Sequence, residues 1–258
     1  MGERGTAVQK DYYEKMNSIC IATYNGEKYI EEQLHSILSQ ISEDDEVIIS
    51  DDSSTDRTLE LIESIADPRV KIYHADYHHF KWNFENALRH ACGEIIFLSD
   101  QDDVWIEGKY RACLEALKEY DLVCTNSIVV DSELRPLIPD FFKYYHSGKG
   151  IIKNSLKNTY FGACLAFKRR VKEAALPFPK TMEIGHDIWI GLVAESIGKV
   201  KFIDTPYLLY RRHANALTNV LNNLSNRSSR PFITKVTSRF IVLYNILKFN
   251  INKKNNDR

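Results

Sequence analysis

Three carboxylates stand within four residues at the end of an apolar segment. Residues 94–98 read Glu-Ile-Ile-Phe-Leu, and Asp100, Asp102 and Asp103 follow them. A phosphate brought to Asp100 or Asp102 would be repelled by about 4 kcal/mol per charge pair at roughly 4 Å and an effective dielectric near 20. A divalent cation reverses that sign, and oxygen-only ligands favour Mg²⁺ or Mn²⁺ over zinc. Alternatively, Asp102 or Asp103 caps a helix that begins near Val104, but one cap needs one acid. The pattern therefore favours a metal site.

A second polar cluster, Ser-Asp-Asp-Ser-Ser-Thr-Asp at 50–56, also follows an apolar run. Ser53 or Ser54 is expected to cap the next helix, with Asp56 placed to favour the dipole of its first turn. Neither role explains Asp51 and Asp52 at the end of the strand. A carboxylate there can accept hydrogen bonds from a nucleotide base or a ribose.

Two further groups of residues lie in the second half of the chain. Asp187, in the sequence EIGHDIWIG, begins an apolar-faced helix. It is either the N-cap or a carboxylate held ionised by the helix N-terminus, which suits a general base. Arg211, Arg212 and His213 end a strand. They form either a solvated basic turn or a site at which His213 ligates the metal and an arginine meets phosphate.

The elements that carry these residues alternate between strand and helix. Apolar runs predict strands, and apolar residues at helical spacing predict the intervening helices. Such regular alternation indicates an α/β fold in which helices cover both faces of a parallel sheet, with ligands bound beyond the carboxyl ends of the strands. The predicted strands are 18–24, 46–50, 70–74 and 94–99, and the predicted helices are 27–40, 55–66, 83–91 and 106–120.

The alternation fades after a further predicted strand at 121–130. A loop rich in Pro, Phe and Tyr precedes an apolar segment at 161–167, and a helix is predicted over 187–197. We divide the chain into an N-terminal extension, a single α/β domain and a basic C-terminal tail, which are residues 1–16, 17–219 and 220–258.

Composition and charge exclude several classes of protein. The chain has 258 residues, 44% hydrophobic content and a net charge of −1, typical of a globular domain. The segment from Arg227 onward contains eight basic residues and one acidic residue. It therefore carries a charge of +7, and the remainder of the chain carries −8. An acidic body with a basic tail is not the charge distribution of a nucleic-acid-binding domain. Five scattered cysteines favour a reducing, cytoplasmic location, and no apolar run approaches the roughly 20 residues of a membrane-spanning helix.

The glycine-rich phosphate-binding motifs of dinucleotide-binding and P-loop proteins are absent. The sheet edge is instead lined with acids and hydroxyls. Five segments, taken in order, resemble the family 2 glycosyltransferases of GT-A fold, closest to bacterial rhamnosyltransferase-like members: SICIATYNGEKYIEEQLHSIL, EVIISDDSSTDRT, GEIIFLSDQDDVW, HDIW and YRRHAN. The resemblance covers about residues 17–219. It implies an inverting, metal-dependent transfer of a sugar from a nucleotide diphosphate to an acceptor hydroxyl.

The resemblance also implies roles for single residues. Asp100 and Asp102 would be the D-x-D pair, with Asp102 holding Mn²⁺ or Mg²⁺ against the diphosphate. Asp187 would deprotonate the acceptor, and His213 would approach the metal. The residues implied on the donor are Thr23, Tyr24 and Asn25 in the nucleotide pocket, Asp52 on the base or ribose, and Asn83 on the sugar.

Two departures from the family pattern bear on these expectations. Many members have glycine where this chain has Ser53, a change expected to matter little because serine can cap a helix. The Q-x-x-R-W motif of processive synthases is missing, which predicts one sugar per encounter.

The donor is expected to be dTDP-rhamnose or a UDP-sugar, and the acceptor a glycan or lipid-linked precursor of surface polysaccharide. The alternative is a non-catalytic nucleotide-sugar-binding or scaffold protein of the same fold.

The tail, residues 231–251, interleaves apolar and basic residues. One interpretation is an ordinary helix docked on the body. The other is an interfacial amphipathic helix, whose basic residues contribute about 1 kcal/mol each near anionic lipid. The second would place the protein peripherally on the inner face of the cell membrane.

Overall fold

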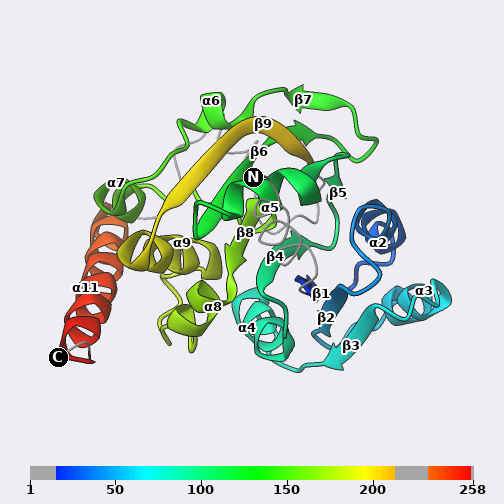
Figure 1. Cartoon of the computed structure of the whole chain (residues 1–258), viewed down its shortest axis with the longest axis horizontal. Coiled ribbons are helices and arrows are strands. Elements are labelled where there is room, and N and C mark those ends of the chain that lie inside the picture. Colours follow the sequence, from blue (N-terminus) through cyan, green and yellow to red (C-terminus); the bar gives the residue numbers. More distant parts are fainter. Residues whose placement is uncertain (1–15, 213–231, 257–258) are drawn as a thin grey trace, which may run out of the picture.

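The computed structural model describes residues 16–212 and 232–256 (Figure 1). Nine strands in this part of the chain form one sheet, in the order β3-β2-β1-β4-β8-β6-β9-β5 with β7 paired to β6. The strands are β1 (Ser18–Thr23), β2 (Glu46–Asp51), β3 (Val70–His74), β4 (Ile95–Asp100), β5 (Val104–Trp105), β6 (Leu122–Val130), β7 (Pro136–Ile138), β8 (Leu165–Lys168) and β9 (Val200–Arg211).

The first half of the sheet is parallel, as predicted. β1 pairs in parallel with β2 and β4, and β2 pairs in parallel with β3. The inner strands are continuous apolar runs, such as Ile95–Leu98 and Val47–Ile49, which are fully or almost fully buried. That composition is typical of strands covered by helices on both faces.

The second half of the sheet mixes both directions, which explains why the alternation fades in the sequence. β8 runs antiparallel to both β4 and β6, whereas β6 and β9 are parallel. The whole is a mostly parallel α/β sheet with some antiparallel strands. The segment predicted at 161–167 is split into a 3-10 turn, η1 (Gly162–Cys164), followed by β8.

Helices cover both faces of the sheet. They are α2 (Ile30–Leu38), α3 (Thr58–Ser64), α4 (Phe80–His90), α5 (Lys109–Leu117), α6 (Phe141–Tyr145), α7 (Ile151–Leu156), α8 (Arg169–Ala175), α9 (His186–Ile197) and α11 (Phe232–Asn256). Among the described residues, none of these helices is long and apolar enough to cross a bilayer.

Three helices begin three residues later than predicted, and all three follow a polar cluster at a strand end. α2 begins at Ile30 rather than residue 27, α3 at Thr58 rather than residue 55, and α5 at Lys109 rather than residue 106. The polar residues ahead of each helix are used for hydrogen bonds between loops instead. The edge of the sheet is therefore more elaborate than helical periodicity alone indicates.

α4 shows the opposite error and begins at Phe80 instead of residue 83. His79 caps it, because its Nδ1 accepts a hydrogen bond from the backbone N–H of Lys81 at 3.2 Å. Histidine is not among the residues preferred at N-caps, so the usual capping residues do not mark this start.

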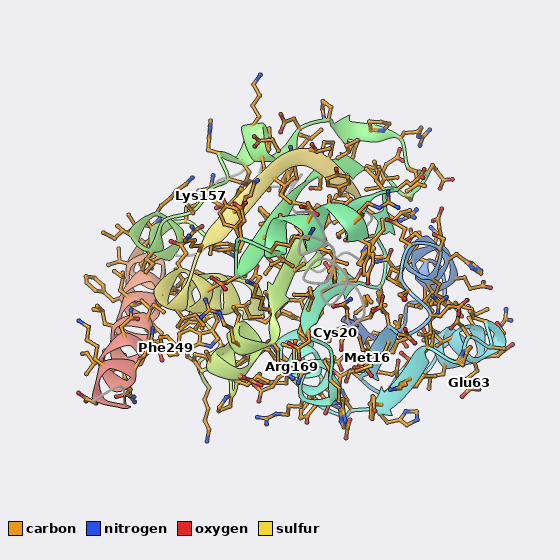
Figure 2. The ribbon with its side chains drawn as sticks, viewed as in Figure 1. Met16, Cys20, Glu63, Lys157, Arg169 and Phe249 are labelled. Atoms are coloured by element: carbon orange, nitrogen blue, oxygen red, sulfur yellow. The ribbon has the colours of Figure 1, made fainter. Side chains whose placement is uncertain are left out.

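The tail helix α11 packs on the body next to α7 and α9, at the flank far from α3 (Figure 1). Val242 and Ile246 are buried, and Phe249 is labelled on α11 in Figure 2. The centroid of the Phe249 ring lies 5.9 Å from that of Trp189. Of the two interpretations that the sequence leaves open, the structure shows a helix docked on the body, and contact of the same helix with a membrane stays untested. The boundaries at 16/17 and 219/220 stay predictions, and the second lies outside the described residues.

Candidate active site

The carboxyl ends of three parallel strands bring the polar clusters together. In the register of the sheet, Thr23 of β1 lies beside Asp51 of β2, and Ala22 lies beside Asp100 of β4. Parallel strands in register end at one edge, so the clusters at 22–27, 50–56 and 99–103 meet there. This is the convergence that the sequence predicts.

Gln101 joins the loop after β1 to the acidic loop after β4. Its side-chain oxygen accepts from the backbone N–H of Tyr24 at 2.8 Å, and its side-chain nitrogen donates to the Tyr24 carbonyl at 3.0 Å. A Cβ on Gly26 would lie 2.5 Å from the Gln101 Oε1 atom, so a side chain at this position would displace Gln101 from these two hydrogen bonds. No sequence pattern predicts a role for Gln101, although it stands inside the acidic motif.

Asn25 joins the loop after β1 to the loop after β2. Its Oδ1 accepts from the backbone N–H of Thr55 at 2.8 Å, and its own backbone N–H donates to the Ser54 hydroxyl at 2.9 Å. Tyr24 is 54% exposed, so its ring is available to a ligand. The placement of Tyr24 and Asn25 at the edge agrees with a nucleotide pocket there.

Asp51 and Asp52 support the loops around them. Asp51 accepts from the hydroxyls of Thr23 at 2.9 Å and Ser54 at 2.6 Å, and from the backbone N–H of Ser54 at 2.9 Å. The carboxylate of Asp52 accepts three backbone N–H groups, at 2.6–3.1 Å, from residues 77–79. A carboxylate has about four acceptor positions, so one remains on Asp52 for a ligand. Its predicted contact to base or ribose stays a prediction.

The predicted capping of α3 by Ser53 or Ser54 is wrong. Arg57 is the N-cap residue and forms no side-chain cap, whereas Asp56 accepts from the backbone N–H of Thr58 at 3.0 Å. Ser53 instead has a φ of 63°, in the left-handed region, and its hydroxyl donates to the carbonyl of Ala75 at 2.8 Å. This backbone conformation explains a preference for glycine there.

The acidic cluster does not cap a helix. β5 follows it directly, and α5 begins only after Gly108, so the alternative of a cap at Asp102 or Asp103 is wrong. Ligand oxygens of Asp100, Asp102 and Asp103 lie within 4.8 Å of one another. Burial, and then the charge of Asp102, raises the pKa of Asp100 to about 7. Burial also raises the pKa of Asp103 well above its usual range, with the charges of Asp102 and Asp100 adding to it.

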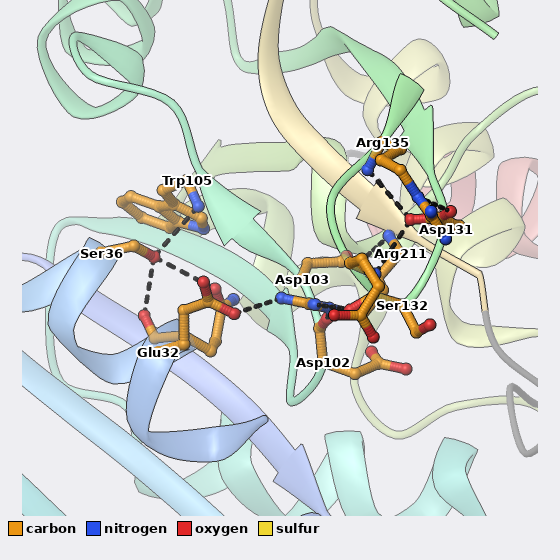
Figure 3. A network of polar contacts seen from close by, with 11 residues as sticks. Glu32, Ser36, Asp102, Asp103, Trp105, Asp131, Ser132, Arg135 and Arg211 are labelled. Carbon is orange, nitrogen blue, oxygen red and sulfur yellow. Dashed lines mark hydrogen bonds and ion pairs between the residues drawn. The ribbon is translucent and has the colours of Figure 1, made fainter. Parts of the chain in front are cut away.

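Arg211 holds the acidic loop in place (Figure 3). Its backbone N–H donates to Asp103 Oδ1 at 2.9 Å, and its Nε donates to the backbone carbonyl of Asp102 at 2.7 Å. The guanidinium also donates to the Ser132 carbonyl at 2.7 Å and pairs with Glu32. Arg211 is 3% exposed and fully engaged. Arg212 is also buried, its guanidinium lies 3.8 Å from the centroid of the Tyr210 ring, and its charge lowers the pKa of Asp100. The predicted contact of an arginine with phosphate stays a prediction.

The described residues fit a divalent cation. The donor atoms are all carboxylate oxygens, which suit Mg²⁺ or Mn²⁺. Asp103 is completely buried, and within the described part of the chain its Oδ2 has no hydrogen-bond partner. A cation would supply that partner and remove the repulsion that raises the pKa values of Asp100 and Asp103. His213, the other predicted ligand, lies outside the described residues.

Asp187 lies in the first turn of α9, close enough to Asp100 to raise its pKa. The N-cap is Gly185, so the capping alternative for Asp187 is wrong. Asp187 accepts from the backbone N–H of Ile188 at 2.7 Å and from Asn158 Nδ2 at 2.9 Å. Burial outweighs both hydrogen bonds and raises the pKa of Asp187 to about 6. It is therefore ionised at neutral pH yet basic enough to accept a proton.

Asn158 is a residue that the sequence analysis missed. Its amide donates to the Tyr160 carbonyl at 3.0 Å and accepts from the Tyr160 N–H at 2.9 Å, which fixes the orientation of the group that faces Asp187. The two residues are 29 positions apart on different elements. No local sequence pattern signals such a contact.

Two buried basic side chains lie near the segment that carries Asp187. Lys81 is 1% exposed, and its ammonium donates to the carbonyls of Pro179 and Thr181, which holds the loop ahead of Asp187. Burial lowers the pKa of Lys81 to about 8. His186 stacks on Phe84 at 4.2 Å, and burial lowers its pKa to about 3, so it is a neutral ring.

Asn83, which the family pattern implied on the donor sugar, lies beneath the loop after β1. Its Nδ2 donates to the carbonyl of Thr23 at 3.1 Å, and it is 2% exposed. Its Oδ1 has no partner among the described residues. A contact to the sugar stays a prediction.

The sheet, the acidic cluster at its edge and the facing carboxylate define a GT-A-fold transferase. The chain belongs to glycosyltransferase family 2: the family model "Glycosyl transferase family 2" matches residues 18–174. It is similar to the dTDP-rhamnosyl transferase RfbG of Shigella flexneri, with 30% identity over 76% of this chain and 72% of that protein. The chain is therefore a glycosyltransferase.

A second relative and a solved structure extend the comparison. The chain is 24% identical to the Escherichia coli UDP-Glc:alpha-D-GlcNAc-diphosphoundecaprenol beta-1,3-glucosyltransferase WfgD, over 69% of this chain and 70% of that protein. The fold is similar to that of the mannosyltransferase PcManGT from Pyrobaculum calidifontis, solved in complex with GDP-Man and Mn²⁺. The TM-score is 0.58 at 19% identity, covering 92% of this chain and 72% of that one.

Proposed function

We propose that this enzyme transfers a single sugar, with inversion, from a nucleotide-diphosphate donor to an acceptor hydroxyl in bacterial surface polysaccharide biosynthesis. The observation that carries the proposal is the position of Asp187, a carboxylate of suitable basicity, close enough to the acidic cluster for its charge to raise the pKa of Asp100. A base and a leaving-group site must lie on opposite sides of the anomeric carbon for a single displacement. In this proposal the sugar lies between Asp187 and the acidic cluster.

Each part of the site has a separate task in this proposal. Tyr24 and Asn25 bind the nucleotide, with Thr23, Asp52 and Asn83 lining or supporting that pocket. Asp187 removes the proton from the acceptor hydroxyl as the hydroxyl attacks, which general-base catalysis makes about 10² to 10⁴ times faster. Arg212 stabilises the negative charge of the departing diphosphate.

Asp100, Asp102 and Asp103 would hold Mn²⁺ or Mg²⁺. When bound, the cation would supply charge stabilisation to the diphosphate leaving group. The Mn²⁺ named with the mannosyltransferase supports this assignment, as does the unpartnered Oδ2 of Asp103. We further propose His213 as a ligand that approaches when donor binds.

The donor and acceptor are proposed from the relatives. The RfbG resemblance favours dTDP-rhamnose, and the WfgD resemblance favours a UDP-sugar and an acceptor carried on a lipid diphosphate. A lipid-linked acceptor would bring the enzyme to the cytoplasmic face of the membrane. All five cysteines are free thiols, which agrees with a reducing compartment.

The proposal is tested with the full chain and a panel of nucleoside diphosphates and nucleotide sugars, with Mn²⁺ or with chelator. A nucleotide bound at 100 times its Kd should stabilise the native state by about 2.7 kcal/mol, and only when the metal is present. Turnover of the matching donor should be lost in Asp102→Asn but kept in Asp44→Asn, an exposed carboxylate ahead of β2. Full metal-dependent turnover in Asp102→Asn would refute the metal assignment.

A further inference from the structure

The docked helix α11 has a second apolar face that nothing in the described chain covers. Val242 and Ile246 are buried against the body. On the other side, four large side chains recur at spacings of four, three and four residues, which aligns them along one side of a helix. They are 59–67% exposed and define what we call the outer stripe: Phe240, Tyr244, Leu247 and Ile251.

The charge of α11 has a single sign. Phe232–Asn256 contains five basic residues and no acidic one. Lys248 and Lys254 are exposed and neighbour the outer stripe along the helix. A second copy packed on this stripe would bring two basic helices together, whereas an anionic surface complements both the charge and the apolar side chains.

We propose that the outer stripe of α11, flanked by Lys248 and Lys254, docks on an anionic lipid bilayer surface. Such a helix lies in the plane of the interface with its apolar face among the lipid headgroups and its basic residues near anionic lipid. The partner is a bilayer, bound without a membrane-spanning segment in the described residues.

The contacts of α11 explain why docking at this helix would serve the reaction. Arg239 Nε donates to the carbonyl of Leu156 at 3.0 Å, two residues before Asn158, and the Ser238 hydroxyl donates to Glu183, four residues before Asp187. The helix thus contacts both loops that carry the base and its partner. Lipid under α11 would bring a lipid-linked acceptor to the Asp187 side of the site; this step rests on the proposed function.

The neighbouring helix α7 also carries exposed apolar side chains. Its Ile152 is 72% exposed and its Leu156 is 49% exposed. α7 lies beside α11 (Figure 1). Exposed apolar residues are therefore present on both of these adjacent helices.

The test is co-sedimentation of the full chain with vesicles of phosphatidylcholine alone, or of phosphatidylcholine mixed with phosphatidylglycerol. We expect binding to the mixed vesicles that weakens with salt, and a roughly tenfold or greater loss in the double variant Leu247→Glu with Ile251→Glu. A second double variant, Lys248→Gln with Lys254→Gln, should bind the mixed vesicles more weakly than the unchanged protein does. On vesicles of phosphatidylcholine alone it should behave as the unchanged protein does. The matched control is Leu137→Glu, which changes an exposed leucine on β7 and should bind as the unchanged protein does.

Either of two results would overturn the proposal. One is that the unchanged protein does not bind the mixed vesicles better than phosphatidylcholine alone, or that the Leu247→Glu/Ile251→Glu variant binds the mixed vesicles as well as the Leu137→Glu control does. The other is that the variant converts a dimer into a monomer in sedimentation velocity, which would assign the stripe to a second copy. Donor hydrolysis measured without lipid separates this proposal from the proposed function. Hydrolysis should persist in the stripe variants and is lost in Asp102→Asn whether or not lipid binds.

Discussion

The proposed donor side and the proposed acceptor side of the site are built in different ways. On the donor side, Asp51 and Asp52 between them accept four backbone N–H groups and two hydroxyls, so the loops after β1, β2 and β3 hold one another. On the acceptor side, Asp187 depends on Asn158, and the loop before it depends on Lys81 and Ser238. Two buried carboxylates that bond mostly to backbone N–H groups hold the first side, and single side chains hold the second.

This difference indicates where the family can vary. A loop whose backbone N–H groups bond to buried carboxylates keeps its shape whatever its exposed side chains are, which suits a nucleotide site shared by many enzymes. A base held by single side chains can be repositioned by one substitution, which suits an acceptor that differs between enzymes. Substitutions on the acceptor side are therefore expected to change the reaction, and those on the donor side to change binding and stability.

The largest effect is expected from Asp187→Asn. The amide keeps the size of the side chain but cannot accept a proton, so transfer should fall by about 10² to 10⁴-fold. Donor affinity, measured by titration of the nucleotide with Mn²⁺, should not change. If turnover survived, the acceptor side would have to draw its base from another residue, and the comparison of the two sides would fail.

Arg211→Gln should cost more stability than any other donor-side change considered, because a 3% exposed guanidinium and its bonds to Asp102 and Ser132 are lost. Each hydrogen bond to a charged group contributes about 2 kcal/mol to the free energy of unfolding, and unfolding in urea measures how much of it the variant loses. Arg135→Gln is the control: that side chain is 75% exposed and pairs with Asp131 at the surface. Equal unfolding midpoints for the two variants would contradict the role of Arg211.

Asn158→Ala tests how the acceptor side sets the basicity of Asp187. Removing the Asn158 amide removes a hydrogen bond that favours the ionised form, so the pKa of Asp187 should rise from about 6 by under about one pH unit. The base acts only when ionised, so the rate is lost as pH falls through this pKa. The acidic limb of the pH–rate profile should therefore move to higher pH in the variant. A uniform fall in rate with an unmoved limb would mean that Asn158 only supports the fold.

The donor side could be predicted from the sequence because its signals are local. β1 to β4 are short apolar runs, and the polar residues that do chemistry directly follow them, so parallel pairing alone brings Thr23, Asp51 and Asp100 together. What the helical periodicity missed is the length of the loops between. Side chains such as Gln101 and Asn25 satisfy backbone groups there in place of an early helical turn.

The acceptor side could be predicted only in part. Asp187 was found because it precedes an apolar helix, but its partner Asn158 lies in an irregular segment with no period. The antiparallel insertion of β8 between β4 and β6 was not predicted either, because a four-residue strand carries too little pattern to set its direction. Contacts between residues far apart in sequence decide this half of the site.

The smallest effect, at Ser53, tests whether the donor loops hold a strained residue. With a φ of 63°, a side chain at this position costs about 1 kcal/mol relative to glycine, while the Ser53 hydroxyl recovers part of that through the Ala75 carbonyl. Ser53→Ala loses the hydrogen bond and keeps the strain, whereas Ser53→Gly loses both. Glycine should therefore be more stable than alanine by about 1 kcal/mol in urea unfolding. Equal free energies of unfolding for Ser53→Ala and Ser53→Gly would mean that the donor side does not hold Ser53 in a left-handed conformation. The preference of the family for glycine at this position would then need another explanation.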